Sequence, residues 1–98
     1  MHVRGGYVYI MANNYRSVYY IGVTSNLFNR VYEHKNFEKP GFTSKYKCIE
    51  LVWFECFSTI GEAIIKEKQL KKWNRSWKEN LIRKMNPRME DLTNMIED

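Results

Sequence analysis

An arginine and a histidine, Arg30 and His34, lie four residues apart just after the run VYYIG. At about 100° per residue of helix, the two side chains share one helical face. Tyr9 and Tyr20 stand in the two tyrosine-rich runs that precede this segment. An arginine can hold a phosphate through two hydrogen bonds, and a tyrosine or histidine can move a proton. This set of residue types could therefore bind a phosphate and move a proton beside it.

A carboxylate, Glu67, falls near the middle of an apolar stripe expected on a helix that begins at Ile60. The stripe consists of Ile60, Ala63, Ile64 and Leu70. Because burying an unpaired carboxylate is costly, we expect Glu67 to be neutral, ion-paired or bound to a cation. A simple alternative is an i,i+4 ion pair with Lys71. As no aspartate precedes Asp91, we expect a single Mg²⁺ or Mn²⁺ ion on Glu67 rather than a two-metal cluster.

Each of these residues also has an ordinary structural explanation. Tyr9 and Tyr20 could be strand tyrosines that pack through their rings and keep the hydroxyl in water. His34 could end a helix, where a cation is favoured, and Arg30 could be a surface arginine. The residues by themselves do not separate Tyr9, Tyr20 and His34 as the general base. The convergence of all five residues is what favours a catalytic site.

The length and composition fit one soluble domain. The 98 residues are 44% apolar and 15% aromatic, enough for a core without a metal or disulfide staple. Cys48 and Cys56 lie at the two ends of a predicted strand, about 26 Å apart at about 3.3 Å per residue, so they should not bridge. With no targeting segment and no apolar run near 20 residues, we expect a reduced, cytoplasmic protein that avoids membranes.

Positive charge is concentrated in the second half of the chain. The formal net charge is +5, and residues 66–84 contain eight Lys or Arg against Glu67 and Glu79. Such a segment suggests a polyanion partner, although a solvated lysine-rich helix face would look the same. The residues predicted to bind nucleic acid are Arg30, Lys45, Lys71, Lys72 and Arg75.

Local patterns predict an α/β (α+β) domain of order ββαβαα, a three-stranded sheet flanked by three helices. The expected strands are Tyr7–Ala12, Val18–Val23 and Ile49–Phe57, the first two forming a hairpin around NNYRS. The expected helices run to about Asn36 after a cap within Thr24–Asn26, from Ile60 to Asn74 after a Thr59–Glu62 capping box, and from Trp77 to Met85. Residues 36–47 are expected to form a loop.

Two short motifs carry a family resemblance. The run YVY at Tyr7–Tyr9, followed by YIG at Tyr20–Gly22, resembles the paired signature of the GIY-YIG nuclease superfamily, which includes the N-terminal domain of excinuclease C. Arg30 and His34 follow YIG at the places expected for that family. The run EAIIKEKQLKKW resembles the family helix that carries a metal-binding glutamate, which would be Glu67 in this chain. Asn86 resembles a late family asparagine. The resemblance covers residues 7–92, leaving 1–6 and 93–98 as tails, and looks closest to small standalone bacterial proteins.

The resemblance implies a metal-dependent endonuclease acting on DNA or structured nucleic acid, with repair or recombination as its setting. It implies Tyr9 as the base, with His34 supporting that base or accepting its proton, and Tyr20 as the residue that positions water or phosphate. Gly22 and Asn86 are implied as supporting residues. An accessory protein could supply targeting, and the oligomeric state is left open. A catalytically silent nucleic-acid-binding module is the main alternative. An interaction domain anchored by Trp73 and Trp77 is a weaker one.

Overall fold

The computed structural model describes residues 5–36 and 41–96. Its strands are β1 (Gly6–Ala12), β2 (Tyr19–Thr24) and β3 (Glu50–Phe57). Its helices are α1 (Leu27–Lys35), α2 (Phe42–Tyr46), α3 (Ile60–Lys71), α4 (Arg75–Met85) and the 3-10 turn η1 (Thr93–Met95). The predicted α+β class and the order ββαβαα are confirmed, with the short helix α2 added between α1 and β3.

The sheet is antiparallel, and β1 lies at its centre in the order β2-β1-β3. Because side chains alternate along a strand, Tyr9 and Met11 point to one face of β1, while Val8, Ile10 and Ala12 point to the other. Tyr9 pairs with Gly22 on β2 and with Phe54 on β3. The central strand therefore contributes to two separate cores.

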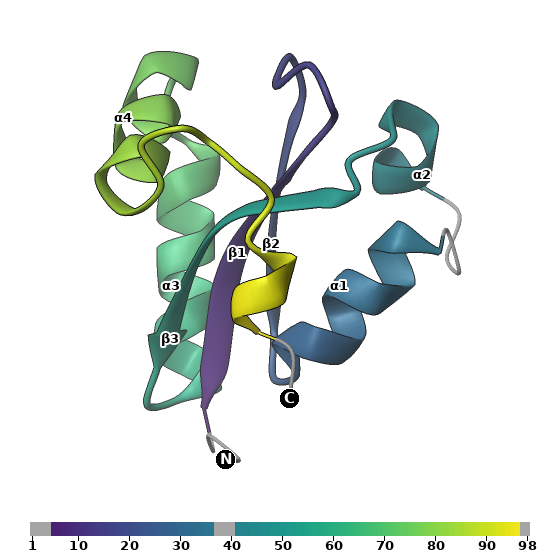
Figure 1. The fold of residues 1–98 in the computed structure, drawn as a ribbon. Coiled ribbons are helices and arrows are strands. Elements are labelled where there is room, and N and C mark those ends of the chain that lie inside the picture. The colour runs from purple at the N-terminus through teal and green to yellow at the C-terminus, as the bar shows by residue number, and fades with distance from the viewer. Residues whose placement is uncertain (1–4, 37–40, 97–98) are drawn as a thin grey trace.

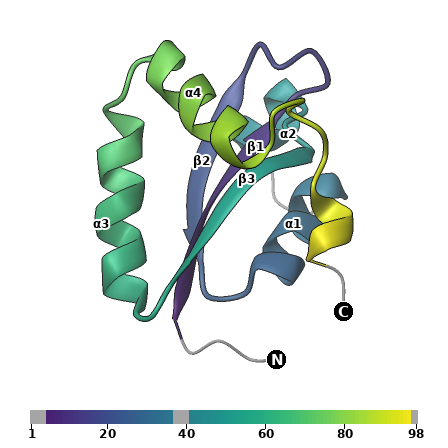
Figure 2. The ribbon, with the colours of Figure 1, turned by 60° about the vertical axis from the view of Figure 1, so that its left-hand side comes forward.

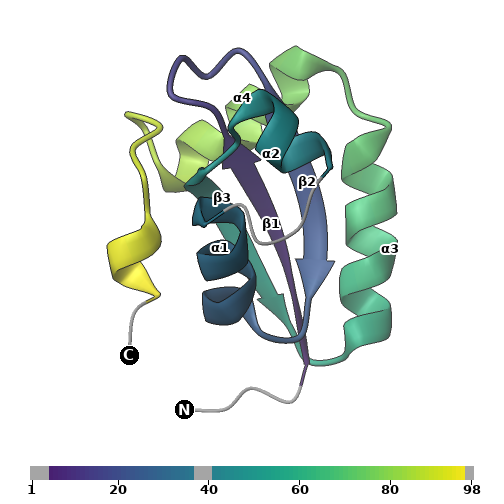
Figure 3. The same ribbon diagram turned by 90° about the vertical axis from the view of Figure 1, so that its right-hand side faces the viewer.

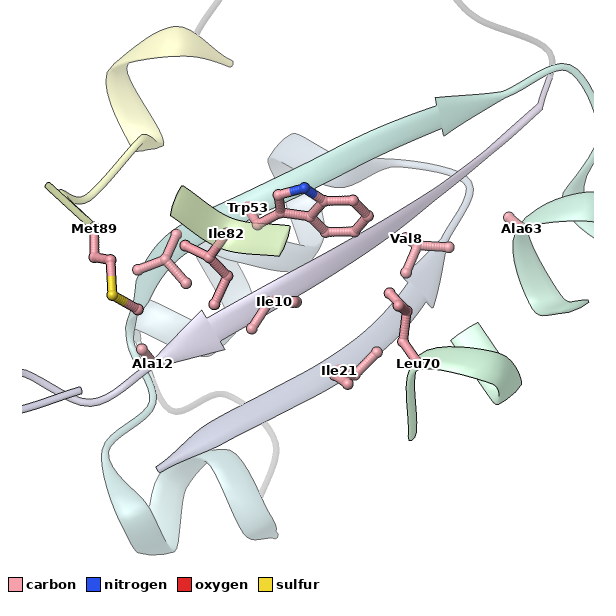
Figure 4. Close-up of a cluster of buried hydrophobic side chains, with 10 residues drawn as sticks. Val8, Ile10, Ala12, Ile21, Trp53, Ala63, Leu70, Ile82 and Met89 are labelled. Carbon is pink, nitrogen blue, oxygen red and sulfur yellow. The ribbon is translucent and has the colours of Figure 1, made fainter. Parts of the chain in front are cut away.

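Helices cover both faces of the sheet (Figure 1). One face is covered by α3 and α4, with α3 running along β2 (Figure 2 and Figure 3), and the other face is covered by α1 and α2 (Figure 3). The core toward α3 and α4, most of it labelled in Figure 4, contains Val8, Ile10, Ala12, Ile21, Val52, Trp53, Ala63, Leu70, Ile82 and Met89. The core toward α1 contains Tyr9, Met11, Leu27, Val31, Cys48 and Leu51.

The segment predicted to be a loop contains a helix. Although Gly41 interrupts the chain with a φ of 148°, α2 follows it immediately. A helix of one turn is unstable in isolation, and tertiary contacts hold this one. The Thr43 carbonyl accepts a hydrogen bond from the Cys48 amide at 2.9 Å, and the Thr43 hydroxyl contacts α1.

Helix α4 begins at Arg75 rather than at Trp77, because the Asn74 side chain caps it by accepting a hydrogen bond from the Trp77 amide at 2.9 Å. The preceding helix ends at Lys71, three residues earlier than predicted. The cap expected within Thr24–Asn26 falls on Asn26, and Thr59 caps α3, since each side chain accepts the amide proton of the residue three positions on. The Glu62 carboxylate accepts a hydrogen bond from the Ser58 hydroxyl, so the structure shows the Thr59 half of the predicted capping box.

Other expectations concern the cysteines, the chain ends and membranes. Cys48 and Cys56 are both free thiols, as predicted. Residues 1–4 and 97–98 of the predicted tails lie outside the described residues, whereas the sheet begins at Gly6 and Ile96 packs against the α1-side core. Within residues 5–36 and 41–96, no helix has the length and apolar character needed to cross a membrane.

Candidate active site

Three rings gather on the α1 side of the sheet. Tyr9 comes from β1, Tyr20 from β2 and His34 from α1, and we call them the ring cluster. The ring centroids lie 6.3 Å apart for Tyr9 and Tyr20, 5.6 Å for Tyr9 and His34, and 5.5 Å for Tyr20 and His34. The Tyr9 hydroxyl is 2.9 Å from Nε2 of His34, within hydrogen-bonding distance. Two tyrosines and a histidine from separate elements thus meet at one point.

Gly22 makes room for the Tyr9 side chain. The two residues are paired across β1 and β2, and a Cβ on Gly22 would collide with the Tyr9 hydroxyl. The Tyr9 ring can therefore lie over β2 only because residue 22 has no side chain. This gives Gly22 a steric role in placing the hydroxyl.

The Tyr9 hydroxyl lies in an environment that disfavours its ionised form. Tyr9 is fully buried, and burial, with the nearby Tyr20, raises its pKa well above the usual value of a tyrosine. Arg30 opposes this shift, because its guanidinium lies close enough to the hydroxyl to favour the phenolate. Arg30 also forms an ion pair with Glu33 at 3.1 Å and remains about one third exposed. Part of Arg30 is therefore open to solvent while its guanidinium stays close to the Tyr9 hydroxyl.

Thr43 is a residue of the site that the sequence did not reveal. Its Oγ1 lies 3.1 Å from Nδ1 of His34, so both nitrogens of the imidazole ring have a hydrogen-bond partner. In the neutral ring one nitrogen donates and the other accepts, so the bond to Thr43 helps to decide which one faces Tyr9. No motif marks Thr43, because its contact arises only when α2 packs on α1.

Glu67 lies on α3 with its side chain 13% exposed. The predicted apolar stripe is only partly correct: Ala63 and Leu70 are fully buried, but Ile60 and Ile64 are 43% and 36% exposed. Glu67 therefore sits at the border of the buried face rather than in its middle. Its Oε2 forms the i,i+4 ion pair with Lys71, at 3.2 Å, that was the simple alternative.

The donor set around Glu67 fits a hard divalent cation that takes most of its ligands from water and substrate. One carboxylate oxygen contacts an ammonium group, and the other has no hydrogen bond from the described part of the chain. Within that part, no group of three His, Cys, Asp or Glu side chains lies close enough to enclose a metal. Glu67 would thus be the single protein ligand.

A shared hollow relates Glu67 to the ring cluster. Lys71, which pairs with Glu67, lines the same open hollow of about 250 Å³ as Tyr20. Tyr20 belongs to both the hollow and the ring cluster, so its side chain connects the cluster with the hollow that Lys71 lines. The structure thus places Tyr9, Tyr20, Arg30 and His34 together, and puts Glu67 on α3 in an ion pair with Lys71.

Comparison with known proteins agrees with this geometry. The model of the GIY-YIG catalytic domain matches residues 5–80. The chain belongs to the GIY-YIG family. A UPF0213 protein of Haloquadratum walsbyi is 36% identical over 75 residues, covering 76% of this chain and 83% of that protein. UPF0213 proteins of Bacillus pumilus and Pediococcus pentosaceus are 33% and 32% identical, covering 67% and 84% of this chain and 67% and 85% of their own lengths. No solved structure matched the chain.

The match confirms the resemblance seen in the two tyrosine motifs. A GIY-YIG catalytic domain is a nuclease domain, so nucleic acid is the substrate class. The matched residues include the ring cluster, Arg30 and Glu67, and they end before Asn86.

In this GIY-YIG domain, Asn86 has a structural task. The register between β1 and β3 pairs Ile10 with Trp53 and Met11 with Leu51, so Val52 is an extra, bulged residue. The buried Asn86 amide nitrogen donates to the Val52 carbonyl at 3.0 Å and to the Glu90 carbonyl at 2.8 Å. Its oxygen accepts the Glu90 amide proton at 3.1 Å. Asn86 therefore supports the sheet from behind the site.

The remaining basic residues predicted to bind nucleic acid differ in how freely they can do so. Arg75 donates to the carbonyls of Arg16 and Ser17 at 2.6 and 2.8 Å, and forms an ion pair with Glu79 at 3.3 Å. These bonds fasten the β1–β2 turn to α4, so a phosphate would have to compete with them. Lys45 lies over the Tyr46 ring on α2, and Lys72 is exposed at the end of α3.

Proposed function

We propose that this GIY-YIG domain is a metal-dependent endonuclease that hydrolyses phosphodiester bonds in DNA. The observation that carries the proposal is the buried Tyr9 hydroxyl, 2.9 Å from Nε2 of His34 and beside the Arg30 guanidinium. A tyrosine needed only for packing would not require a histidine and an arginine at its hydroxyl. The resemblance to the N-terminal domain of excinuclease C supports repair or recombination in the cytoplasm as the setting, with an accessory protein for targeting.

The proposed proton path runs from water to Tyr9 and then to His34. Because burial raises the Tyr9 pKa, a standing phenolate is costly, and the base must lose its own proton as it gains one. The Tyr9 oxygen takes a proton from the attacking water while the hydroxyl proton passes to Nε2 of His34. The resulting hydroxide forms the new bond to phosphorus, and the bond to the leaving oxygen breaks with its electron pair on that oxygen, which takes a proton from solvent. The imidazole becomes a cation and afterwards returns its proton to solvent.

This path requires that Nε2 of His34 accepts and that Nδ1 carries a proton. The Thr43 hydroxyl, 3.1 Å from Nδ1, can accept that proton's hydrogen bond and so hold the ring in the required tautomer. In the imidazolium both nitrogens donate, and the same bond stabilises the cation. Thr43 is thereby proposed as a positioning residue for His34.

Arg30 and Glu67 would deal with the charge on the phosphate. The guanidinium, about one third exposed, can bind two phosphate oxygens while remaining next to Tyr9. Glu67 would hold a Mg²⁺ or Mn²⁺ ion, which when bound supplies positive charge for the phosphate and the leaving oxygen. In the structure the Lys71 ammonium group is ion-paired with the Glu67 carboxylate, so we propose that the bound cation displaces Lys71 from this carboxylate.

The decisive experiment compares two glutamates on the same helix. Purified protein is incubated with labelled DNA and RNA of several structures, with Mg²⁺ or Mn²⁺, and Glu67→Gln is compared with Glu62→Gln. Glu62 is exposed, contacts Ser58 and lies at the start of α3, so its variant is the matched control. We expect Glu67→Gln to lose cleavage and to retain nucleic-acid binding, and Glu62→Gln to keep both.

Cleavage that survives Glu67→Gln would refute the assignment of the site. The Lys71 ion pair on Glu67 is the one observation that favours a catalytically silent nucleic-acid-binding module, because the carboxylate is already neutralised. Binding without cleavage by the unaltered protein across all substrates and both metals would establish that alternative.

A further inference from the structure

An open hollow of about 250 Å³ runs over the exposed edge of β2. It is lined by Tyr19, Tyr20, Ile21, Lys71 and Lys78. Alternation along β2 places Tyr20 on the α1 side of the sheet and its two neighbours on the α4 side, so the hollow continues from one face to the other. Helix α3 lies alongside this edge (Figure 3) and contributes Lys71, while α4 contributes Lys78. Two ammonium groups from different helices therefore line one concave surface.

The acids near the hollow already have partners. Glu79 accepts a hydrogen bond from the Tyr19 hydroxyl at 2.8 Å and pairs with Arg75 at 3.3 Å. Glu67 pairs with Lys71 at 3.2 Å. Two carboxylates thus face three cations, and one positive charge is left over.

The excess charge resides on Lys78. It is half-buried in the wall of the hollow, and no carboxylate of residues 5–36 and 41–96 pairs with it. A lysine with an acidic partner gains stability from the pair, whereas Lys78 keeps its charge available to a ligand. The hollow is therefore suited to an anion.

We propose that the hollow is a subsite for a backbone phosphate of the nucleic-acid strand, adjacent to the phosphate that is cleaved, with Lys78 as its main ligand. The proposal rests on nucleic acid being the substrate of the site. Lysine binds phosphate as a compact point charge with three donors, and the apolar wall formed by Ile21 and the tyrosine rings offers a surface for the sugar.

The position of Tyr20 links the subsite to the chemistry. Tyr20 lines the hollow and also lies 6.3 Å, centroid to centroid, from Tyr9. Tyr20 is consequently the side chain that lies between the hollow and Tyr9. A strand crossing this edge would present one phosphate to the ring cluster and its neighbour to Lys78.

The first test measures binding rather than cleavage. Lys78→Met removes the charge and keeps an apolar stem, and Lys84→Met makes the same charge change at an exposed position of the same helix. Affinity for a labelled DNA duplex is measured by fluorescence anisotropy over a range of salt concentrations. One lost phosphate contact should weaken binding about eightfold at about 0.1 M salt and lower the salt slope by about 0.9.

We expect this loss for Lys78→Met, a clearly smaller loss for Lys84→Met, and affinity close to that of the unaltered protein for Lys78→Arg. Equal losses in the two methionine variants would overturn the proposal, because they would show that only overall charge matters. Circular dichroism and thermal melting of all three variants establish that the fold is intact.

A second measurement tests the subsite even if the protein cleaves no nucleic acid. Inorganic phosphate is titrated into the ¹⁵N-labelled protein, and amide and lysine ammonium signals are followed by NMR. We expect saturable shifts at Tyr19, Tyr20 and Lys78 that disappear in Lys78→Met. Shifts confined to other lysines, or no shifts, would overturn the subsite, while the separate Glu67 experiment decides whether the domain is a nuclease.

Discussion

Removing the Thr43 hydroxyl tests whether His34 must be held in one tautomer. Thr43→Val keeps the branched shape of the side chain and deletes the oxygen that lies 3.1 Å from Nδ1 of His34. Thr43→Ser, the matched control, keeps the hydroxyl and deletes a methyl group. The Tyr9 contact to Nε2, at 2.9 Å, is untouched by either change. Any effect on the proton path must then arise through the imidazole ring.

The size of the effect follows from the worth of one hydrogen bond. A net contribution of about 0.5 to 1.5 kcal/mol corresponds to about a 2- to 13-fold loss of rate. Since Thr43 contacts no substrate in the proposed site, the loss should appear in kcat, with KM nearly unchanged. We expect Thr43→Ser to lie within about twofold of the unaltered protein.

Two assays check this reasoning. Steady-state cleavage gives kcat and KM, and long-range ¹H–¹⁵N correlation spectra report which imidazole nitrogen of His34 carries the proton. The valine variant should show the lower kcat together with a larger share of the Nε2–H tautomer. An unchanged tautomer and an unchanged kcat in Thr43→Val would refute the role of Thr43, as would equal damage by valine and serine.

Two further predictions concern Tyr9 and its surroundings. Gly22→Ala should destabilise the fold by about 1 to 3 kcal/mol, because the new methyl group meets the Tyr9 hydroxyl. Gly61→Ala on α3, whose methyl group would meet only the Thr59 hydroxyl oxygen at 3.9 Å, should be neutral or stabilising, and urea denaturation measures both variants. In an absorbance titration at alkaline pH, Tyr9 and Tyr19 should ionise above the usual range of a tyrosine. Burial raises both pKa values, that of Tyr19 to about 12 with help from its hydrogen bond to Glu79. Both pKa values lie above that of an unfolded tyrosine, near 10, so the stability from the neutral hydroxyls is complete below about pH 10 and is lost as the pH rises further. Titration curves of Tyr9→Phe and Tyr19→Phe that match that of the unaltered protein would contradict this.

Much of the fold could be predicted because its signals are local. Alternating β-branched and aromatic residues mark the strands, and short polar caps such as Asn26 and Thr59 mark where helices begin. Each signal acts between residues a few positions apart, so it can be recognised without knowledge of the elements that pack against it. The predictions were wrong where local signals are weak: α2 has a single turn and was predicted to be a loop, and α4 begins at Arg75, two residues before the predicted start at Trp77.

The candidate site, like the fold, could be predicted in part from local signals. The spacing of Arg30 and His34 on one helix face, and the family motifs around Tyr9 and Tyr20, indicated a phosphodiester chemistry before any fold was known. The stripe around Glu67 was only partly right, because helical periodicity says which residues share a face and not how deeply that face is buried. The ion pair between Glu67 and Lys71 could be predicted as an alternative, because it joins two residues one turn apart on the same helix.

Only the tertiary structure determined the contacts between elements that lie far apart in the chain. The distance from Thr43 to His34 depends on how α2 packs on α1, and the bonds that occupy Arg75 depend on where the β1–β2 turn meets α4. The lone charge of Lys78 became visible only when the neighbouring acids were seen to be paired. Sequence determines which groups are present and their local periodicity, but packing determines which charges neutralise one another, because ion pairs and hydrogen bonds act over distances of a few ångströms in space.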